Sequence, residues 1–143
     1  MAARHRHGRM AGTLERPLSV EERLHKIRTL LQIGVDGAQA AERAETELAI
    51  RRRAATACET GFHALVMLSD LLIERAGHAP VESHSSRVEA LEDIGQGDLA
   101  NQYSLAMHAL HIDGYYAQRF GRLQRDRLRD LAEVVERELA KLA

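Results

Sequence analysis

Apolar residues recur three and four positions apart along most of this chain, which is the repeat of an α-helix with one buried face. The clearest stripe consists of Cys58, Phe62, Leu65, Ser69 and Leu72. Neighbouring apolar residues widen this stripe beyond one face, so we expect this stretch to form the most buried helix. No segment shows the alternation of apolar and polar residues that is typical of a β-strand.

The same pattern predicts four substantial helices and one short one. Their ranges are 19–34, 38–76, 86–94, 99–120 and 122–142. The residues at the boundaries support them, because they have the types that cap or end helices. Two capping boxes are expected, Ser19 with Glu22 and Ser86 with Glu89; the further expected caps and stops are Gly34, Asp36, Gly37, Gly77, Asp98 and Gly121.

Helices joined by short connections favour an all-α fold, an antiparallel up-down bundle of four to five helices. Residues 18–143 then form one domain, which is a normal size for 143 residues. Residues 1–17 are basic, contain two glycines and a proline and show no periodicity, so we expect a flexible basic arm there.

Composition also indicates where the protein is located and suggests one type of partner. No apolar run approaches the ~20 residues of a membrane span, and no apolar stretch follows the basic start as in a signal peptide. The lone Cys58 forms no internal disulfide, so we expect a cytoplasmic protein with no membrane partner. The net charge is −1, but 18 of the 20 basic residues are arginines, and 12 of these lie in three clusters, within 1–17, 51–53 and 119–129. RNA could bind these clusters, although a coding bias toward arginine explains them as well.

Several kinds of active site are not supported. Glu22 and His25 form a single Glu-x-x-His pair, whereas di-iron bundles need two. His108, His111 and Tyr115 can share one helix face, but they are too few for a closed zinc site. There is neither a glycine-rich phosphate loop nor a Ser-His-Asp arrangement, so we expect no metal and no cofactor.

Residues 107–120 contain the densest polar cluster on a helix that must also pack. Gly114 lies inside this helix, where glycine costs about 1 kcal/mol relative to alanine. Such a glycine serves either close packing or a functional site. The polar side chains form either a site or a set of satisfied contacts at a seam between helices or subunits.

The stretch Thr60–Gly77, the Ser-His pair of the loop that follows, and Asp113-Gly-Tyr-Tyr116 resemble the HEPN superfamily (higher eukaryotes and prokaryotes nucleotide-binding). The resemblance covers about residues 38–142. It implies a helical bundle, often dimeric, that pairs with a minimal nucleotidyltransferase or acts as a ribonuclease toxin. The toxins carry an arginine, four to six residues, and a histidine. In this chain His108 stands at the arginine, Asp113 at the histidine and Tyr115 at the tyrosine of the motif.

Since the catalytic pair is missing, the resemblance implies a non-catalytic binding protein, a homodimer or the partner of a nucleotidyltransferase in a toxin–antitoxin or defence-type module. The alternatives are a divergent ribonuclease using His108, His111 and Arg119, and an RNA-associated structural subunit. We expect the partner-binding residues to lie in or beside a cleft at a dimer seam. They are His108, His111, Asp113, Tyr115, Tyr116 and Arg119. The resemblance further implies that a nucleotidyltransferase could modify Tyr115.

Overall fold

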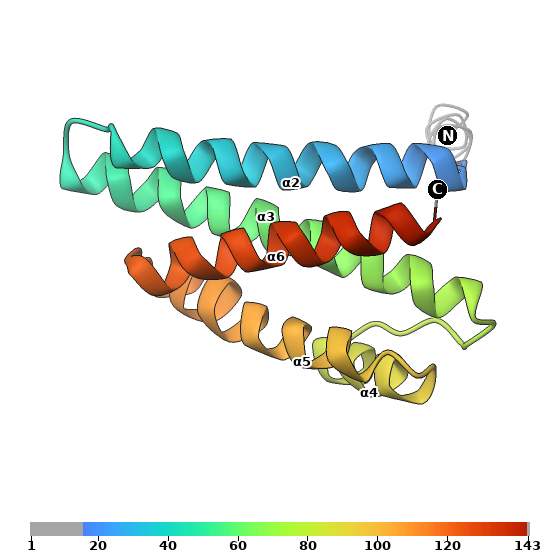
Figure 1. Ribbon diagram of the computed structural model, residues 1–143. Helices are drawn as coiled ribbons and strands as arrows, with labels where there is room; N and C mark the ends of the chain where they lie inside the picture. The colour runs from blue at the N-terminus through green and yellow to red at the C-terminus, as the bar shows by residue number, and fades with distance from the viewer. Residues whose placement is uncertain (1–15, 143) are drawn as a thin grey trace, which may run out of the picture.

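A computed structural model describes residues 16–142 and contains no strand within them (Figure 1). The helices are α2 (Val20–Glu42), α3 (Glu47–Arg75), α4 (His84–Asp93), α5 (Gly97–Ala106), η1 (Met107–Tyr116) and α6 (Arg122–Leu142). The π-helix η1 continues α5 without a break, so the two form one pass through the molecule. The prediction of an all-α fold is confirmed.

Four antiparallel passes make up the bundle, namely α2, α3, α5 with η1, and α6 (Figure 1). The short α4 lies in the connection between α3 and α5 and packs against both. Each pass contacts its neighbour in sequence, and α2 also contacts α6. This is the up-down topology that short connections favour.

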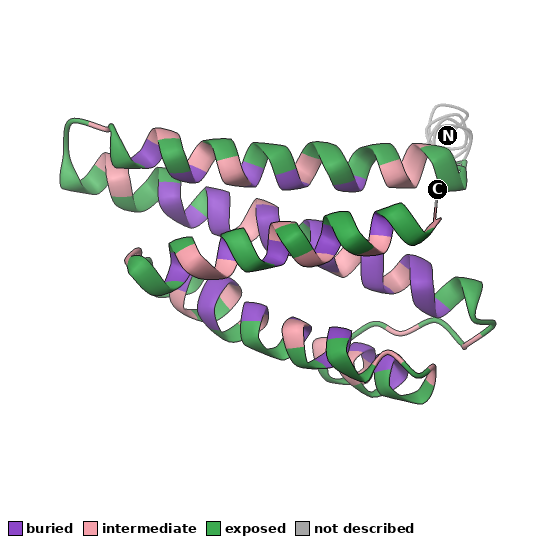
Figure 2. Cartoon of the chain, viewed as in Figure 1, coloured by how far each residue is buried: buried purple, intermediate pink, exposed green. Residues whose placement is uncertain are grey.

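The buried faces of the helices point toward one another and enclose a core that is mostly aliphatic (Figure 2). α3 contributes most to this core, and the whole predicted stripe from Cys58 to Leu72 is buried. Leu65 and Phe62 are each 1% exposed. The last two passes contribute Tyr103, Leu110 and Val135, which are fully buried.

Within the described residues, α3 alone is long and apolar enough to cross a membrane by length and composition. Two thirds of its most apolar window (67%) is buried against the other helices. The central helix of a bundle is apolar because other helices cover most of its sides.

The predicted break after the first helix is wrong. α2 continues through Gly34 and Gly37 to Glu42, and Asp36 lies inside it, where it accepts a hydrogen bond from Gln32 Nε2 at 2.8 Å. These glycines allow α2 and α3 to approach closely. A Cβ on Gly34 would lie 2.8 Å from the backbone of Gly61, closer than real Cβ atoms come.

α3 accordingly begins later than predicted, at Glu47 after the N-cap Thr46, whose hydroxyl accepts a hydrogen bond from the Ala49 amide at 3.1 Å. Its predicted end is confirmed, because Gly77 follows it with a φ of +77°. Glycine adopts this left-handed conformation without strain.

The starts of the last three helices also differ from the prediction. The capping box of α4 pairs Ser83 with Ser86, not Ser86 with Glu89, and the helix begins two residues earlier. Asp98 lies inside α5 and caps nothing. Gly121 does not end the α5–η1 pass, which stops at Tyr116. Instead the Gly121 amide donates to Gln124 Oε1 (2.9 Å) at the start of α6.

Most of the predicted basic arm, residues 1–15, lies outside the described residues. Its last arginine, Arg16, binds both carboxylate oxygens of Glu22 at 3.0 Å. Glu22 also accepts a hydrogen bond from the Ser19 amide and completes the predicted capping box. The Arg16 hydrogen bonds, with those from Ser19, lower the pKa of Glu22 to about 2.

Candidate functional site

The predicted partner-binding segment forms the π-helix η1, in which each amide bonds the carbonyl five residues earlier instead of four. Ten residues is long for a π-helix, since most consist of a single turn. Such segments are frequent at functional sites. The unusual backbone therefore coincides with the densest polar cluster of the sequence.

Gly114 explains how η1 fits against α3. A Cβ at this position would lie 2.8 Å from Cys58 Sγ, so only glycine allows the two backbones to come this close. Of the two roles that the sequence left open for Gly114, the structure shows close packing. Burial raises the pKa of the Cys58 thiol to about 12, with the charge of Glu59 adding to the effect.

The π register decides which of the predicted residues meet. The ring of His111 lies 5.0 Å from Tyr116 and 6.4 Å from Tyr115 between centroids, and the two tyrosines lie 5.1 Å apart. His108 is exposed and takes no part in this cluster. Of the expectation that His108, His111 and Tyr115 line one face, the part about His111 and Tyr115 is confirmed and the part about His108 is wrong. It assumed α-helical rotation, whereas residues five apart are neighbours along a π-helix.

Asp113 and Arg119 are also separate from the cluster of rings. The two are joined through the backbone, where the Arg119 amide bonds the Asp113 carbonyl at 2.9 Å. Among the described residues neither side chain makes a hydrogen bond or an ion pair. The structure thus brings together three of the six predicted residues, His111, Tyr115 and Tyr116.

Two residues of α3 fix the orientation of His111. Its Nδ1 lies 2.8 Å from Glu59 Oε2 and 3.1 Å from Glu59 Oε1, and its ring stacks on Phe62 with centroids 5.2 Å apart. Phe62 is 1% exposed, so the imidazole rests on a rigid part of the core. The other ring nitrogen, Nε2, makes no hydrogen bond with the described residues.

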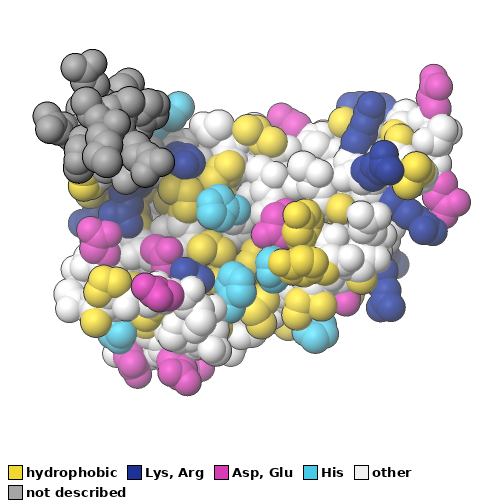
Figure 3. Space-filling model, turned by 180° about the vertical axis from the view of Figure 1, so that it is seen from behind, with side chains coloured by type: hydrophobic (Ala, Val, Ile, Leu, Met, Phe, Trp, Pro, Cys, Tyr) yellow, Lys and Arg dark blue, Asp and Glu magenta, His cyan; other side chains and the backbone are white. Residues whose placement is uncertain are grey.

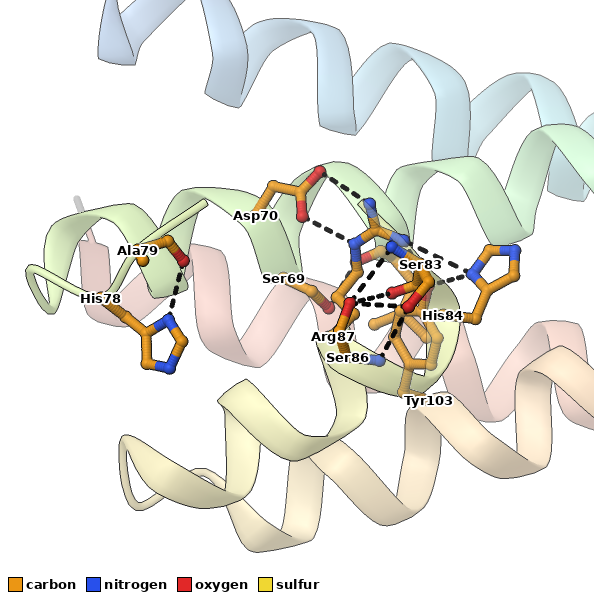
Figure 4. A network of polar contacts seen from close by, with 10 residues as sticks. Ser69, Asp70, His78, Ala79, Ser83, His84, Ser86, Arg87 and Tyr103 are labelled. Carbon is orange, nitrogen blue, oxygen red and sulfur yellow. Dashed lines mark hydrogen bonds and ion pairs between the residues drawn. The ribbon is translucent and has the colours of Figure 1, made fainter. Parts of the chain in front are cut away.

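A second imidazole, His84 at the start of α4, lies next to His111 with ring centroids 5.0 Å apart. Its Nδ1 is 2.6 Å from the hydroxyl of Tyr103, which is fully buried (Figure 4). Its second ring nitrogen points away from the polar network in Figure 4. Burial, followed by the charges of His111 and Arg87, lowers the pKa of His84.

Arg87 holds this network together from the next turn of α4. Its Nε donates to Asp70 Oδ1 at 2.7 Å, and its Nη1 donates to the Tyr103 hydroxyl at 3.2 Å (Figure 4). Burial acts to lower the pKa of Arg87, but the bonds to Asp70 and Tyr103 keep it above its usual value. Burial also raises the pKa of Tyr103. The network joins α3, α4 and α5 beneath His84.

The outer surface of the α5–η1 pass combines exposed polar residues, such as Ser104 and His108, with large apolar ones. Its exposed large apolar residues are Leu105 (47%), Ile112 (41%), Tyr115 (40%) and Tyr116 (69%). We call these four residues the η1 face. Figure 3 shows histidine and hydrophobic side chains side by side in the middle of the rear of the molecule, with basic side chains toward both ends.

The cavities of the bundle lie away from this face. One of about 460 Å³ lies between α2 and α3, next to Ile33, Arg52 and Thr56. Another of about 400 Å³ lies between α5 and α6, next to Asn101 and Arg137. His111, Tyr115 and Tyr116 do not line either of these two cavities, and both tyrosine rings are exposed.

Most arginines of the third basic cluster have acidic neighbours. Arg122 and Arg129 both contact Asp126, Arg125 contacts Glu42 at 3.4 Å, and Arg127 contacts Asp130 at 3.9 Å. Such pairs reduce the positive potential that would attract RNA. In residues 16–142 no three His, Cys, Asp or Glu side chains are grouped in a way that could hold a metal ion.

Sequence analysis missed Glu59, His84, Arg87 and Tyr103 as members of one cluster with His111. The Ser-His pair in the loop before α4 was a signal for His84, because it belongs to the HEPN-like motifs. Nothing in the spacing indicated Glu59, which is 52 residues from His111. Comparison with protein-family models, curated proteins and solved structures finds no match for this chain. The resemblance to HEPN domains therefore rests on its sequence motifs.

Proposed function

We propose that this chain is a non-catalytic binding protein of HEPN type that associates with a second copy of itself through the η1 face. One observation carries this proposal: four large apolar side chains lie exposed along a single helical pass, and two of them are tyrosines. Tyrosine is enriched in protein interfaces. The rings are held in place by His111, which is itself anchored to Glu59 and Phe62.

The charged residues near η1 favour self-association over binding to a partner that carries charge of a single sign. Opposite charges lie within and just after η1, where the side chains of Asp113 and Arg119 make no ion pair with the described residues. In a twofold dimer, an acidic residue of one subunit can lie against a basic residue of the other, and symmetry repeats this contact. A surface with both signs is therefore complementary to itself.

The test is the mass of the protein in solution across concentrations. Sedimentation equilibrium should give a dimer at tens of micromolar, and the double variant Ile112→Ser/Tyr116→Ser should be monomeric. Leu48→Ser is the matched control, because Leu48 is 56% exposed but lies at the start of α3 and outside the η1 face. A monomeric wild type, or equal dimers in both variants, would contradict the proposal.

The resemblance suggests a second partner, a minimal nucleotidyltransferase in a toxin–antitoxin or defence-type module of the cytoplasm. Tyr115 is its proposed target, and its ring is 40% exposed. Co-expression with such an enzyme and mass spectrometry of the tryptic peptides would test this. Added mass on Tyr115 supports the proposal. If the enzyme modifies another substrate in the same experiment but leaves Tyr115 unmodified, the proposal is wrong.

The divergent ribonuclease remains the second candidate because the structure offers a different pair of groups for it. His84 and His111 are adjacent, and a pair of imidazoles can move protons in phosphodiester cleavage. His108 and Arg119, the partners that we expected for His111, lie outside this pair. Purified protein should leave RNA intact under our first proposal. Suppose instead that the protein cleaves RNA, that His84→Gln and His111→Gln abolish cleavage, and that His108→Gln leaves it unchanged. The ribonuclease would then replace our first proposal.

A further inference from the structure

His84 and His111 share a feature that the proposed self-association does not use. Each imidazole is held through Nδ1, His84 by Tyr103 and His111 by Glu59. Neither Nε2 atom makes a hydrogen bond with residues 16–142, so each is left for a further group. Both rings are partly exposed, and their centroids are 5.0 Å apart. What the pair can bind depends on which Nε2 atom carries a proton.

For His111 the partner decides the tautomer. The carboxylate of Glu59 only accepts hydrogen bonds when ionised, so the Nδ1 atom that contacts it must be the N–H. In the neutral ring the proton is then on Nδ1 and the lone pair is on Nε2. His111 thus presents a hydrogen-bond acceptor at Nε2.

For His84 the network beneath it gives the opposite result. Arg87 can only donate, so it supplies a proton to the oxygen of Tyr103. The Tyr103 hydroxyl proton then needs an acceptor, because the group is fully buried, and His84 Nδ1 lies 2.6 Å away. Arg87 Nη1 also approaches His84 Nδ1 at 3.4 Å, as it would approach a lone pair. The proton of His84 is therefore on Nε2, which is a donor.

We propose that this neighbouring donor and acceptor bind a planar carboxamide attached to an aromatic ring. The amide oxygen accepts from His84 Nε2–H, and the amide N–H donates to His111 Nε2. The aromatic ring packs against Tyr115 and Tyr116, which border His111 on the exposed side. Tyrosine rings offer flat apolar surface for such stacking.

The tautomers of His84 and His111 also exclude some kinds of ligand. A carboxylate has only acceptors and leaves His111 Nε2 facing another lone pair. A metal ion needs lone pairs on both Nε2 atoms, and His84 would have to give up its acceptor role toward Tyr103. An amide with no N–H loses the bond to His111. These differences give three related probes with opposite expectations.

The experiment follows the imidazole signals of histidine-labelled protein by NMR at pH 8 during titration with benzamide. Benzamide should shift the signals of His84 and His111 and leave those of exposed His108 unchanged. N,N-dimethylbenzamide, which lacks the N–H, and benzoate, which lacks the donor, should bind at least tenfold more weakly.

One variant tests the contact with His111 and leaves the network of Arg87 and Tyr103 in place. His111→Ala should reduce benzamide affinity at least tenfold, and His108→Ala should not change it. The proposal is wrong if benzamide moves neither ring, or if the three probes bind equally. Because the site borders the η1 face, the titration is run on the wild type and on Leu105→Ser/Ile112→Ser, which removes apolar residues of that face but keeps both tyrosines. Absence of binding in both overturns the amide site, whereas a monomeric wild type overturns only the proposed self-association.

Discussion

Replacing Gly34 with alanine tests the contact that lets α2 and α3 pack along their whole length. The new Cβ would lie 2.8 Å from both Cα and N of Gly61 and 3.1 Å from the Ala57 carbonyl oxygen. These atoms all belong to the backbone of α3, which cannot rotate away as a side chain can. Relief requires α2 to move away from α3, and that movement loosens the neighbouring contacts of Ile27, Leu31 and Ala38.

Two effects of opposite sign determine the result. Alanine is favoured over glycine inside a helix by about 1 kcal/mol. Inserting atoms into a well-packed interior costs about 1–3 kcal/mol, and occasionally more when the backbone must shift. The clash at Gly34 is with backbone, so we place its cost at or above the upper end of that range. The free energy of unfolding should therefore fall by roughly 2 kcal/mol.

The chain offers two matched controls for this substitution. Gly37 lies one turn further along α2, and a Cβ there would lie 3.1 Å from the Cβ of Ala57, a contact with a side chain. Gly97 in the first turn of α5 has no atom within 4 Å of the added Cβ. Urea unfolding followed by circular dichroism at 222 nm should rank the losses as Gly34→Ala, then Gly37→Ala, then Gly97→Ala. A Gly34→Ala protein as stable as wild type would refute the close approach of α2 and α3.

Three further predictions concern the core and the network. Leu65→Ala should lower the free energy of unfolding by about 2–5 kcal/mol in urea titrations, because Leu65 is buried in α3; a loss near zero would place it at the surface. Cys58 should not react with a thiol reagent at pH 8 until the protein unfolds, because its pKa is about 12; rapid reaction of native protein would contradict its burial. The lowered pKa of His84 means that the unfolded chain binds a proton that the folded chain resists, so stability should decline as pH falls below the ordinary value of 6.5. Urea titrations across pH should show that His84→Gln flattens this decline while His108→Gln does not, and equal slopes would refute it.

Periodicity was enough to predict the fold class and most of the core. The stripe around Leu65 is buried, because a spacing of three and four residues places side chains on one face of an α-helix. Helix ends were less predictable. Gly34 and Gly37 have the residue type that ends helices, but here their lack of a side chain serves contact with α3. That role depends on a partner helix that local sequence does not describe.

The candidate site was predictable in part, for a related reason. The polar composition of residues 107–120 indicated where to look, and His111, Tyr115 and Tyr116 do form a cluster. The π register that excludes His108 is associated with packing of Gly114 on Cys58, a contact between distant parts of the chain. Glu59 and Tyr103 join the cluster in the same way, through tertiary packing alone.

An even number of antiparallel passes returns a chain to the end from which it started. The beginning of α2 and the end of α6 therefore lie together, while the α2–α3 turn lies at the opposite end of the bundle (Figure 1). The order of the helices along the polypeptide can thus be changed without changing their order in space. A circular permutant that joins Leu142 to Arg16 by a short linker and opens between Arg43 and Thr46 would keep all four passes. It would also make α3, the helix that every other one contacts, the first to leave the ribosome.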